Sequence, residues 1–315
     1  MCWIEKVGVI ALEQKDRVGY KKTNNGINDN INKKNILIIG ENSYIGSRFA
    51  KYVGNQFNIT TVGARNGKWK EIDFSDFDSI LHCAGIAHVS QKKHMKALYY
   101  SVNCDLAVNV AKKAKNQGVK QFIFLSSILV YGRSDTEISI KTVPNPESFY
   151  GDSKFRAEKI LYTLSDSEFN ICVIRPPIVY GFGCKGNFPK LVWLAKKLPI
   201  FPNVDNKRSM IYIDNLCAFI SYLIKDNCNG IHLPQNKEYV NTTLLVQTIA
   251  KLHGKKIRTT KIFNPLIYLL MKFISPINKL FGDLFIIYSE KEKINYHVVE
   301  FEHSVRRSIY DEDPM

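Results

Sequence analysis

Residues 35–46 read Asn35-Ile36-Leu37-Ile38-Ile39-Gly40-Glu41-Asn42-Ser43-Tyr44-Ile45-Gly46, and this stretch decides the fold. Its first part is a short apolar run that ends in a glycine, which is typical of a buried parallel strand. A helical pattern follows from about Tyr44 to Gly54. Gly40 permits a tight turn and Gly46 lets the helix pack closely on the strand, although such glycines also serve as simple packing devices.

The start of that predicted helix favours the binding of an anion. A helix N-terminus attracts negative charge through its free N–H groups and its dipole. A strand, a glycine turn and a helix in this order are also the context that a dinucleotide-binding fingerprint requires. We therefore predict that a cofactor pyrophosphate binds at Gly40, Ser43, Tyr44, Ile45 and Gly46.

Strands and helices continue to alternate along the chain. Further strands are predicted at residues 57–62, 78–83, 120–126 and 170–175, and further helices at 98–117 and 149–164. Such alternation produces a parallel sheet with helices on both faces. The predicted fold class is α/β, a Rossmann-type doubly wound parallel sheet with a smaller C-terminal substrate-binding region.

Three regions are expected along the chain. Residues 1–34 end in a polar, asparagine-rich stretch and are predicted to form a mobile leader. Residues 35–175 form the predicted NAD(P)-binding core. Prolines interrupt the pattern after residue 176, so residues 176–315 are expected to form mainly the substrate-binding region and C-terminal helices.

Composition narrows the class of protein. The chain is 45% hydrophobic and 12% aromatic, which is enough for a substantial core. Its seven cysteines are scattered without paired spacings, so we predict no metal site and a reducing, cytoplasmic location. A signal-peptide pattern is absent, and the longest uncharged apolar run near the C-terminus, Ile262 to Met271, is too short to cross a bilayer. The net charge of +15 is spread along the chain without a nucleic-acid-binding motif, so we predict a solvated surface and no nucleic-acid partner.

The segment after the second predicted strand bears on the choice between NAD and NADP. An acid there would bind the ribose hydroxyls of NAD, whereas an arginine accommodates the extra phosphate of NADP. The segment Thr61-Val62-Gly63-Ala64-Arg65-Asn66 contains no acid. Arg65 therefore slightly favours NADP, and NAD stays open. Asp73 is expected either to bind the adenine amino group or to cap a helix.

A tyrosine and a lysine four positions apart are the predicted catalytic pair. Tyr150 and Lys154 lie on one face of a helix at this spacing. An adjacent ammonium lowers the pKa of a phenol, so that the tyrosine can take or return a hydroxyl proton. The strand before them ends in Ser126-Ser127, at the sheet edge where open α/β folds bind ligands. Ser127 is predicted to hydrogen-bond the same substrate oxygen as Tyr150.

Together these residues resemble the extended short-chain dehydrogenase/reductase family, in its NAD-dependent epimerase/dehydratase branch. The glycine turn resembles the family's Gly-x-x-Gly-x-x-Gly motif with Ser43 in the middle place, and Ser126 to Gly132 resembles its Ser-Ser-x-x-Val-Tyr-Gly motif. The resemblance implies that Ala84 and Gly85, in His82-Cys83-Ala84-Gly85, lie by the cofactor together with Asn103. It also implies that Ser126, Asn187 and Arg208 bind a nucleoside-diphosphate sugar, because an arginine guanidinium suits a diphosphate.

The same resemblance narrows the reaction. Dehydratases of this branch carry an acid pair after the catalytic serine or threonine, whereas this chain has Ile128 and Leu129 there, so 4,6-dehydration is excluded. The expected chemistry is hydride transfer at C4 of the sugar, as a 4-epimerase or a 4-ketoreductase of surface-polysaccharide synthesis. The catalytic residues would be Ser127, Tyr150 and Lys154.

Three further expectations concern function and partners. The alternative function for the chain is that of a non-catalytic, NADP-binding regulator or scaffold. Residues 255–283 place lysines beside apolar residues, and are expected to form either a substrate lid packed on the core or a peripheral contact with an anionic membrane. The resemblance also implies a homodimer through the helix that carries Tyr150.

Overall fold

A computed structural model describes residues 33–87, 92–132, 136–287 and 294–311 of the chain. Apart from Lys33 and Lys34, the predicted leader lies outside the described residues.

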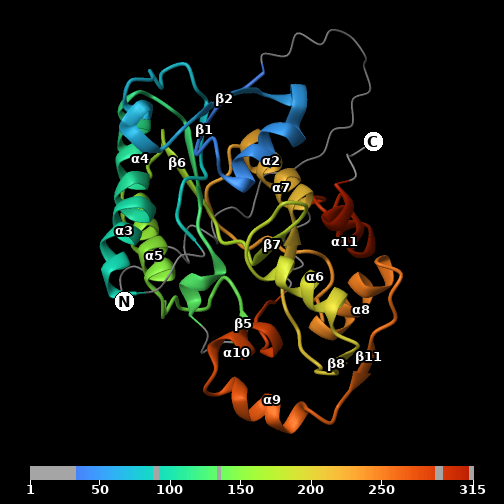
Figure 1. Ribbon diagram of the computed structural model, residues 1–315. Coiled ribbons are helices and arrows are strands. Elements are labelled where there is room, and N and C mark those ends of the chain that lie inside the picture. The colour runs from blue at the N-terminus through green and yellow to red at the C-terminus, as the bar shows by residue number, and fades with distance from the viewer. Residues whose placement is uncertain (1–32, 88–91, 133–135, 288–293, 312–315) are drawn as a thin grey trace.

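The central sheet has six parallel strands (Figure 1). They are β1 (Asn35–Ile39), β2 (Asn58–Val62), β3 (Ser79–His82), β4 (Gln121–Leu125), β6 (Asn170–Ile174) and β10 (Gly230–His232), in the order β10-β6-β4-β3-β1-β2. The first five match the predicted strands, and the sixth comes from the later part of the chain. This arrangement confirms the predicted Rossmann-type α/β fold.

Both faces of the sheet are covered by helices, because successive side chains of a strand point to opposite faces. Ile36 and Ile38 of β1 pack with α2 (Tyr44–Val53) and α7 (Ile213–Lys225). Leu37 and Ile39 pack with α4 (Leu106–Asn116) and α5 (Phe149–Tyr162) on the other face. Figure 1 shows these two helical layers on either side of the sheet. A strand that is apolar at every position is thus buried on both sides.

The helix predicted at residues 98–117 is interrupted. It consists of α3 (Lys96–Tyr100), a π-helical turn η4 (Ser101–Asp105) and α4. A π turn inserts an extra residue into a helix and is common near functional sites. Here it carries the buried side chain of Asn103. The apolar periodicity does not mark this turn, because the side chains on both sides of it still face the core.

The remaining elements form a smaller region. Three short parallel pairs join β7 (Ile178–Tyr180) to β9 (Met210–Tyr212), β8 (Ile200–Pro202) to β11 (Arg258–Thr260), and β5 (Glu137–Ile138) to β12 (Phe285–Ile286). The helices are α6 (Asn187–Lys197), α8 (Thr242–Leu252), α9 (Asn264–Met271), α10 (Ser275–Phe281) and α11 (Phe301–Tyr310).

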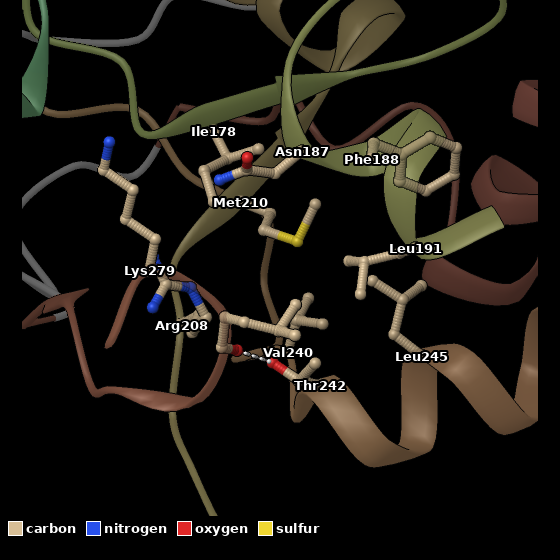
Figure 2. A pocket seen from close by; sticks show the side chains of 11 residues that line it. Ile178, Asn187, Phe188, Leu191, Arg208, Met210, Val240, Thr242, Leu245 and Lys279 are labelled. Atoms are coloured by element: carbon tan, nitrogen blue, oxygen red, sulfur yellow. Dashed lines mark hydrogen bonds between the residues drawn. The ribbon is translucent and has the colours of Figure 1, made fainter. Parts of the chain in front are cut away.

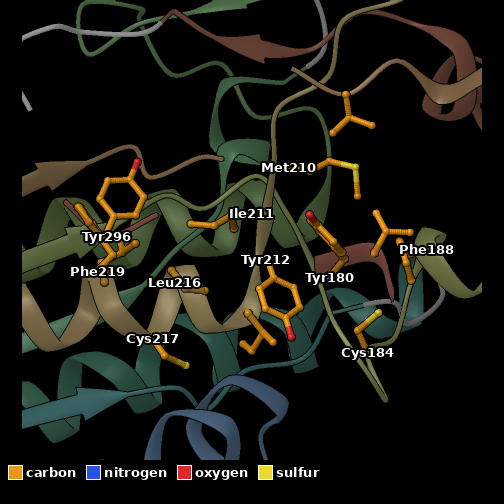
Figure 3. Close-up of a cluster of buried hydrophobic side chains, with 14 of the residues drawn as sticks. Tyr180, Cys184, Phe188, Met210, Ile211, Tyr212, Leu216, Cys217, Phe219 and Tyr296 are labelled. Atoms are coloured by element: carbon orange, nitrogen blue, oxygen red, sulfur yellow. The ribbon is translucent and has the colours of Figure 1, made fainter. Parts of the chain in front are cut away.

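A shared aromatic cluster joins this region to the helical layer formed by α2 and α7. Tyr180 stacks on Phe188 with ring centroids 5.2 Å apart and contacts Tyr212 at 5.6 Å (Figure 3). The Tyr180 hydroxyl accepts a hydrogen bond from Asn236 Nδ2 at 2.9 Å and lies 2.5 Å from Ser304 Oγ. Because these polar atoms are satisfied inside the core, the region is fixed on the sheet through β7, β9 and α11.

Candidate active site

The glycine turn at residues 40–46 is closely packed. Gly40 has φ of 115°, and a Cβ atom there would lie 2.9 Å from the backbone nitrogen of Ala84. A Cβ atom at Gly46 would lie 2.5 Å from Ser43 Oγ and 3.0 Å from Ile38 Cγ2. Any larger residue at either position would push the turn away from the sheet.

Ser43 begins helix α2 as its N-cap, and its hydroxyl accepts a hydrogen bond from the backbone N–H of Gly46 at 3.0 Å. The N–H groups of Tyr44 and Ile45 fall in the first turn, where no carbonyl of the helix can accept from them. The first turn also contains no acidic residue. These features fit the pyrophosphate of a dinucleotide, and the serine that replaces the family's middle glycine stabilises the turn. The Tyr44 hydroxyl is buried and has no hydrogen-bond partner among the described residues, so this residue contributes to the turn through its backbone.

An acid does lie at the end of β2, although it comes from elsewhere in the sequence. A Cβ atom at Gly63 would lie 2.7 Å from Glu41 Oε1, so this carboxylate covers the place where the family's acid would stand. Arg65 is exposed and begins the 3₁₀ helix η2 (Arg65–Lys70) two positions further on. The sequence analysis missed Glu41 because it considered only residues that follow β2 in the chain.

Asp73 is held in a local turn. Its Oδ1 accepts hydrogen bonds from the backbone N–H of Ser75 at 3.0 Å and from Gln117 Nε2 at 3.2 Å. The Ser75 hydrogen bond lowers the pKa of the Asp73 carboxyl. Asp73 therefore caps a turn and not a helix, because no helix lies between η2 and β3, and its contact with the adenine amino group stays a prediction.

Ser127 and Tyr150 meet through two closely packed turns. Ser127 begins the 3₁₀ helix η5 (Ile128–Tyr131), and its Oγ accepts from the Leu129 N–H at 3.2 Å. Ser148 is the N-cap of α5 and accepts from the Gly151 N–H at 3.1 Å. A Cβ atom at Gly151 would clash with the Leu129 carbonyl oxygen, so only glycine lets α5 approach η5 this closely.

The pKa of Tyr150 is raised. Burial of the phenol is the main cause, a hydrogen bond with Ser127 acts in the opposite direction, and Tyr99 raises the pKa further. The structure therefore does not show the predicted lowering of this pKa by Lys154. The physical reason is that loss of solvation outweighs the favourable contacts of the phenolate.

Lys154 is directed toward the sheet. Its Nζ donates to the Leu125 carbonyl at 2.7 Å and lies 4.5 Å from the centroid of the Phe124 ring. Burial lowers the pKa of Lys154 to about 8. A Cβ atom at Gly85 would lie 3.2 Å from this Nζ and 3.1 Å from Asn103 Oδ1, so an exposed glycine, an ammonium and an amide share one side of the site.

Asn103 holds this side together. Its Oδ1 accepts from the Ile86 N–H at 2.8 Å, and its Nδ2 donates to the Ile86 carbonyl and to Ser153 Oγ, both at 3.1 Å. The π turn thereby joins the segment of Ala84 and Gly85 to helix α5. The resemblance pointed to Asn103, and the structure supplies this physical role.

A buried ion pair that the sequence analysis missed lies next to the predicted catalytic residues. Arg175 Nη2 lies 2.5 Å from Glu158 Oε2, and Arg175 Nη1 donates to the Tyr131 hydroxyl at 2.6 Å. The Ser126 hydroxyl donates to Glu158. The structure therefore directs Ser126 into this network. A signal was present, because Tyr150, Lys154 and Glu158 follow one another at spacings of four on one helix face.

The predicted substrate residues Asn187 and Arg208 lie in one pocket. Ile178, Phe188, Leu191, Met210, Val240, Thr242, Leu245, Lys279 and Leu280 also line it. Figure 2 shows the nitrogen-bearing ends of Asn187, Arg208 and Lys279 at one side and apolar side chains at the other. Arg208 Nη1 donates to the Gly282 carbonyl at 2.5 Å, and Thr242 Oγ1 donates to the Leu280 carbonyl at 2.8 Å. These bonds hold α10 against the pocket.

Two cations in one pocket suit a diphosphate, and the apolar wall suits a base or a sugar. The sequence analysis included Lys279 only as one lysine of residues 255–283, the segment expected to form either a substrate lid or a membrane contact. Nothing in its local pattern places it near Arg208.

Comparison with known proteins identifies the family. A model described as "NAD dependent epimerase/dehydratase family" matches residues 36–236. A UDP-glucose 4-epimerase of Vibrio cholerae is 34% identical over 248 residues, which cover 69% of this chain and 75% of the relative. An Escherichia coli O157:H7 protein, N-acetyl-alpha-D-glucosaminyl-diphospho-ditrans,octacis-undecaprenol 4-epimerase, is 28% identical over 74% of this chain and 76% of its own length.

Solved structures share the fold. A Bacillus cereus UDP-glucuronic acid 4-epimerase in complex with NAD aligns with a TM-score of 0.65 at 18% identity, covering 87% of this chain and 94% of that one. A dTDP-4-dehydrorhamnose reductase of Bacillus anthracis in complex with NADP aligns with a TM-score of 0.68 at 17% identity, covering 89% of this chain and 100% of that one. Together with the family match, these findings confirm the predicted resemblance and the prediction of an NAD(P)-dependent epimerase or reductase.

Proposed function

The chain belongs to the NAD-dependent epimerase/dehydratase family, and from that membership we propose that it is a 4-epimerase acting on a nucleoside-diphosphate sugar. The observation that carries the proposal is the hydrogen bond between the side chains of Ser127 and Tyr150. Two hydroxyls side by side can hold one sugar oxygen, and one of them can move its proton.

Each residue has a distinct task in this reaction. Bound NAD supplies the hydride acceptor. Tyr150 takes the proton of the C4 hydroxyl and later returns it, while Ser127 donates a hydrogen bond to the same oxygen. Lys154, with a pKa of about 8, is mainly charged at neutral pH and supplies positive charge beside Gly85. Its ammonium therefore stabilises the deprotonated form of acidic groups that lie beside it in the site.

The pocket of Arg208 and Lys279 anchors the substrate at its other end. Epimerisation requires the sugar to present its opposite face before the hydride returns, and an anchored diphosphate keeps the substrate bound during that rotation. Ile128 and Leu129 follow the catalytic serine and offer no acid, so the residues beside Ser127 do not support elimination of water.

Glu41 supports NAD as the retained cofactor. A carboxylate at the end of β2 accepts hydrogen bonds from ribose hydroxyls and repels a 2′-phosphate. We therefore propose that Glu41 replaces the acid missing after β2, which shifts the preference from NADP to NAD. Arg65 is the observation that favours the second candidate, a 4-ketoreductase using NADPH.

Release and identification of the bound nucleotide would distinguish the two functions. Heat-denatured, freshly purified protein is expected to release NAD in about equimolar amount, and to interconvert UDP-glucose and UDP-galactose without added cofactor. A protein that copurifies empty and oxidises NADPH with a 4-keto nucleotide sugar would contradict the epimerase and establish the reductase.

Three further proposals concern organisation and partners. A homodimer through α5 is supported by the exposed side chains of Leu98 and Ile160 on α3 and α5, and light scattering would measure it. The boundaries at residues 35, 176 and 315 remain proposed limits of the core and substrate regions. The E. coli relative is named for a lipid-linked diphospho-sugar, which supports peripheral membrane contact and a role in surface-polysaccharide synthesis for this chain as well.

A further inference from the structure

Helix α9 and its flanks expose an unusual number of large apolar side chains. Ile262 and Phe273 are 82% and 79% exposed, respectively. We call the whole group the α9 surface, which consists of Ile262, Phe263, Leu266, Tyr268, Leu269, Phe273 and Ile274. In Figure 1, α9 lies at the edge of the molecule farthest from β1 and β2. Contiguous apolar surface of this kind generally marks a binding face.

The α9 surface is held outward by contacts on its inner side. Ile267 is buried against the core, and Asn264 Nδ2 donates to the Asn203 carbonyl at 2.9 Å. Phe281, at the end of α10, packs on Phe201 with ring centroids 5.7 Å apart. The helix is therefore apolar on its inner and outer sides, and the outer side is available to a partner.

The charged residues of the segment that carries α9 have one sign. No aspartate or glutamate occurs between Glu238 and Asp283. The basic residues in that interval are Lys251, Lys255, Lys256, Arg258, Lys261, Lys272 and Lys279. A second copy docked by the same face would bring like charges together, whereas an anionic bilayer complements them. Clusters of lysine and arginine beside an apolar helix are the recognised pattern for anionic lipid headgroups.

The length of α9 determines the kind of membrane contact. It has eight residues, and no helix among the described residues is long and apolar enough to cross a membrane. A short helix with apolar side chains flanked by lysines lies in the plane of the headgroups with its apolar side inserted.

The α9 surface is connected to the diphosphate pocket through α10. This helix follows α9 after three residues and contributes Lys279 and Leu280 to the pocket lining, with Lys279 on the same side as Arg208 (Figure 2). The Thr242 and Arg208 hydrogen bonds described above fix α10 in this position. A membrane beneath α9 would therefore lie next to the end of the site that binds the diphosphate.

We propose that the α9 surface docks this protein on an anionic phospholipid bilayer and so brings the diphosphate pocket to the membrane. The significance of that placement rests on the proposed function, whereas the docking itself does not. Two kinds of side chain contribute, because the apolar group inserts and the lysines bind headgroups.

Vesicle flotation with the full-length protein tests the proposal. The protein is expected to float with vesicles of phosphatidylcholine mixed with phosphatidylglycerol, to float less at high salt, and to float weakly with phosphatidylcholine alone. The double variant Ile262→Ser/Phe273→Ser is expected to lower the affinity for mixed vesicles by about tenfold or more. Lys261→Gln/Lys272→Gln is expected to lower it by about tenfold and to reduce the salt dependence.

A control variant removes two exposed apolar side chains that lie outside the α9 surface. Val143 and Val298 are 56% and 52% exposed, and Val143→Ser/Val298→Ser is expected to bind vesicles like the unchanged protein. All three variants are expected to keep epimerase activity on a water-soluble nucleotide sugar, which shows that they are folded and tests the proposed function separately.

Three results would overturn the docking proposal. They are absence of flotation with mixed vesicles, equal flotation of the Ile262→Ser/Phe273→Ser variant, and a dimer in sedimentation that this variant dissociates. The last result would assign the α9 surface to a second copy. Vesicle binding without epimerase activity would leave the docking standing and refute the proposed function.

Discussion

The proposed catalytic end and the proposed diphosphate end of the site are built differently. At the catalytic end local caps form the turns, with Ser43 at the start of α2 and Ser148 at the start of α5. Long-range bonds then bring side chains together there, since Lys154 bonds to Leu125, 29 positions away. At the diphosphate end Arg208 bonds to Gly282, which is 74 positions away. Local caps therefore contribute to the first end, whereas the second depends on long-range packing.

The two ends also differ in solvation. Lys154 is 4% exposed and loses solvation, which lowers its pKa, whereas Lys279 is exposed at the pocket rim. The proposed catalytic end therefore contains a buried and strongly perturbed lysine, while the proposed diphosphate end combines the buried Arg208, bonded to a backbone carbonyl, with the exposed Lys279. Substitutions should therefore affect kcat at the first end and KM at the second.

The largest effect is expected for Tyr150→Phe. Loss of the proton-transferring hydroxyl should lower kcat by about 10²- to 10⁴-fold with little change in KM. Steady-state assays on UDP-glucose measure this, and circular dichroism checks the fold. Tyr268→Phe, which removes an exposed phenol hydroxyl on α9, serves as the control. A Tyr150→Phe enzyme with full activity would support the non-catalytic alternative instead.

A large loss of stability is expected when the buried pair behind the catalytic residues is broken. Glu158→Ala leaves Arg175 as an uncompensated buried charge and should lower the free energy of unfolding by about 3–5 kcal/mol. Urea denaturation measures it. Glu168→Ala breaks the exposed pair with Lys120 and should cost about 0–1 kcal/mol. Equal losses in the two variants would show that the buried pair has no special role.

At the diphosphate end, Lys279→Ala should raise KM about tenfold while kcat changes little. The reason is that a hydrogen bond to a charged group contributes about 1.5–3 kcal/mol to binding. Initial rates over a range of UDP-sugar concentrations give both constants, with Lys272→Ala as the nearby control. A fall in kcat without a rise in KM would contradict the expectation that substitutions at the diphosphate end affect KM.

The buried lysine predicts a pH dependence of stability. Its folded pKa of about 8 lies below the ordinary value of 10.5, so the unfolded chain binds more protons between these pH values. The contribution of Lys154 to stability should therefore rise with pH across that window, by up to about 1.4 kcal/mol per unit. Unfolding of the unchanged protein and of Lys154→Met at several pH values gives the difference. Parallel pH profiles for the two proteins would contradict the lowered pKa.

The smallest effect concerns cofactor choice. Glu41→Gln keeps the shape of the side chain and removes its charge, which should reduce the preference for NAD over NADP by about fivefold. Fluorescence titration of both cofactors on protein stripped of its nucleotide measures the ratio. Arg65→Ala should change the ratio in the opposite direction, and no change in either variant would exclude both residues from the choice.

Much of the fold was predictable because it depends on local patterns. The apolar run of β1, the glycines at 40 and 46, and the spacing of Tyr150 and Lys154 each determine a short stretch of backbone or one helix face. The sixth strand of the sheet was not predicted, because β10 has only three residues and lies beyond the proline-rich segment. The π turn at Asn103 was missed because it leaves the apolar period unchanged.

The sequence alone was enough to predict the parallel sheet, which is confirmed, because backbone geometry and hydrophobic period act over a few residues. The cofactor turn and the roles of Ser127, Tyr150 and Lys154 stay predictions from the same local patterns. Packing in three dimensions was needed to show that Glu41 covers Gly63, that Ser126 bonds to Glu158, and that Lys279 lines a pocket with Arg208. It was also needed to show that burial raises the pKa of Tyr150. The physical reason is that solvation and charge depend on every neighbour in space, and most of these neighbours are distant in the chain.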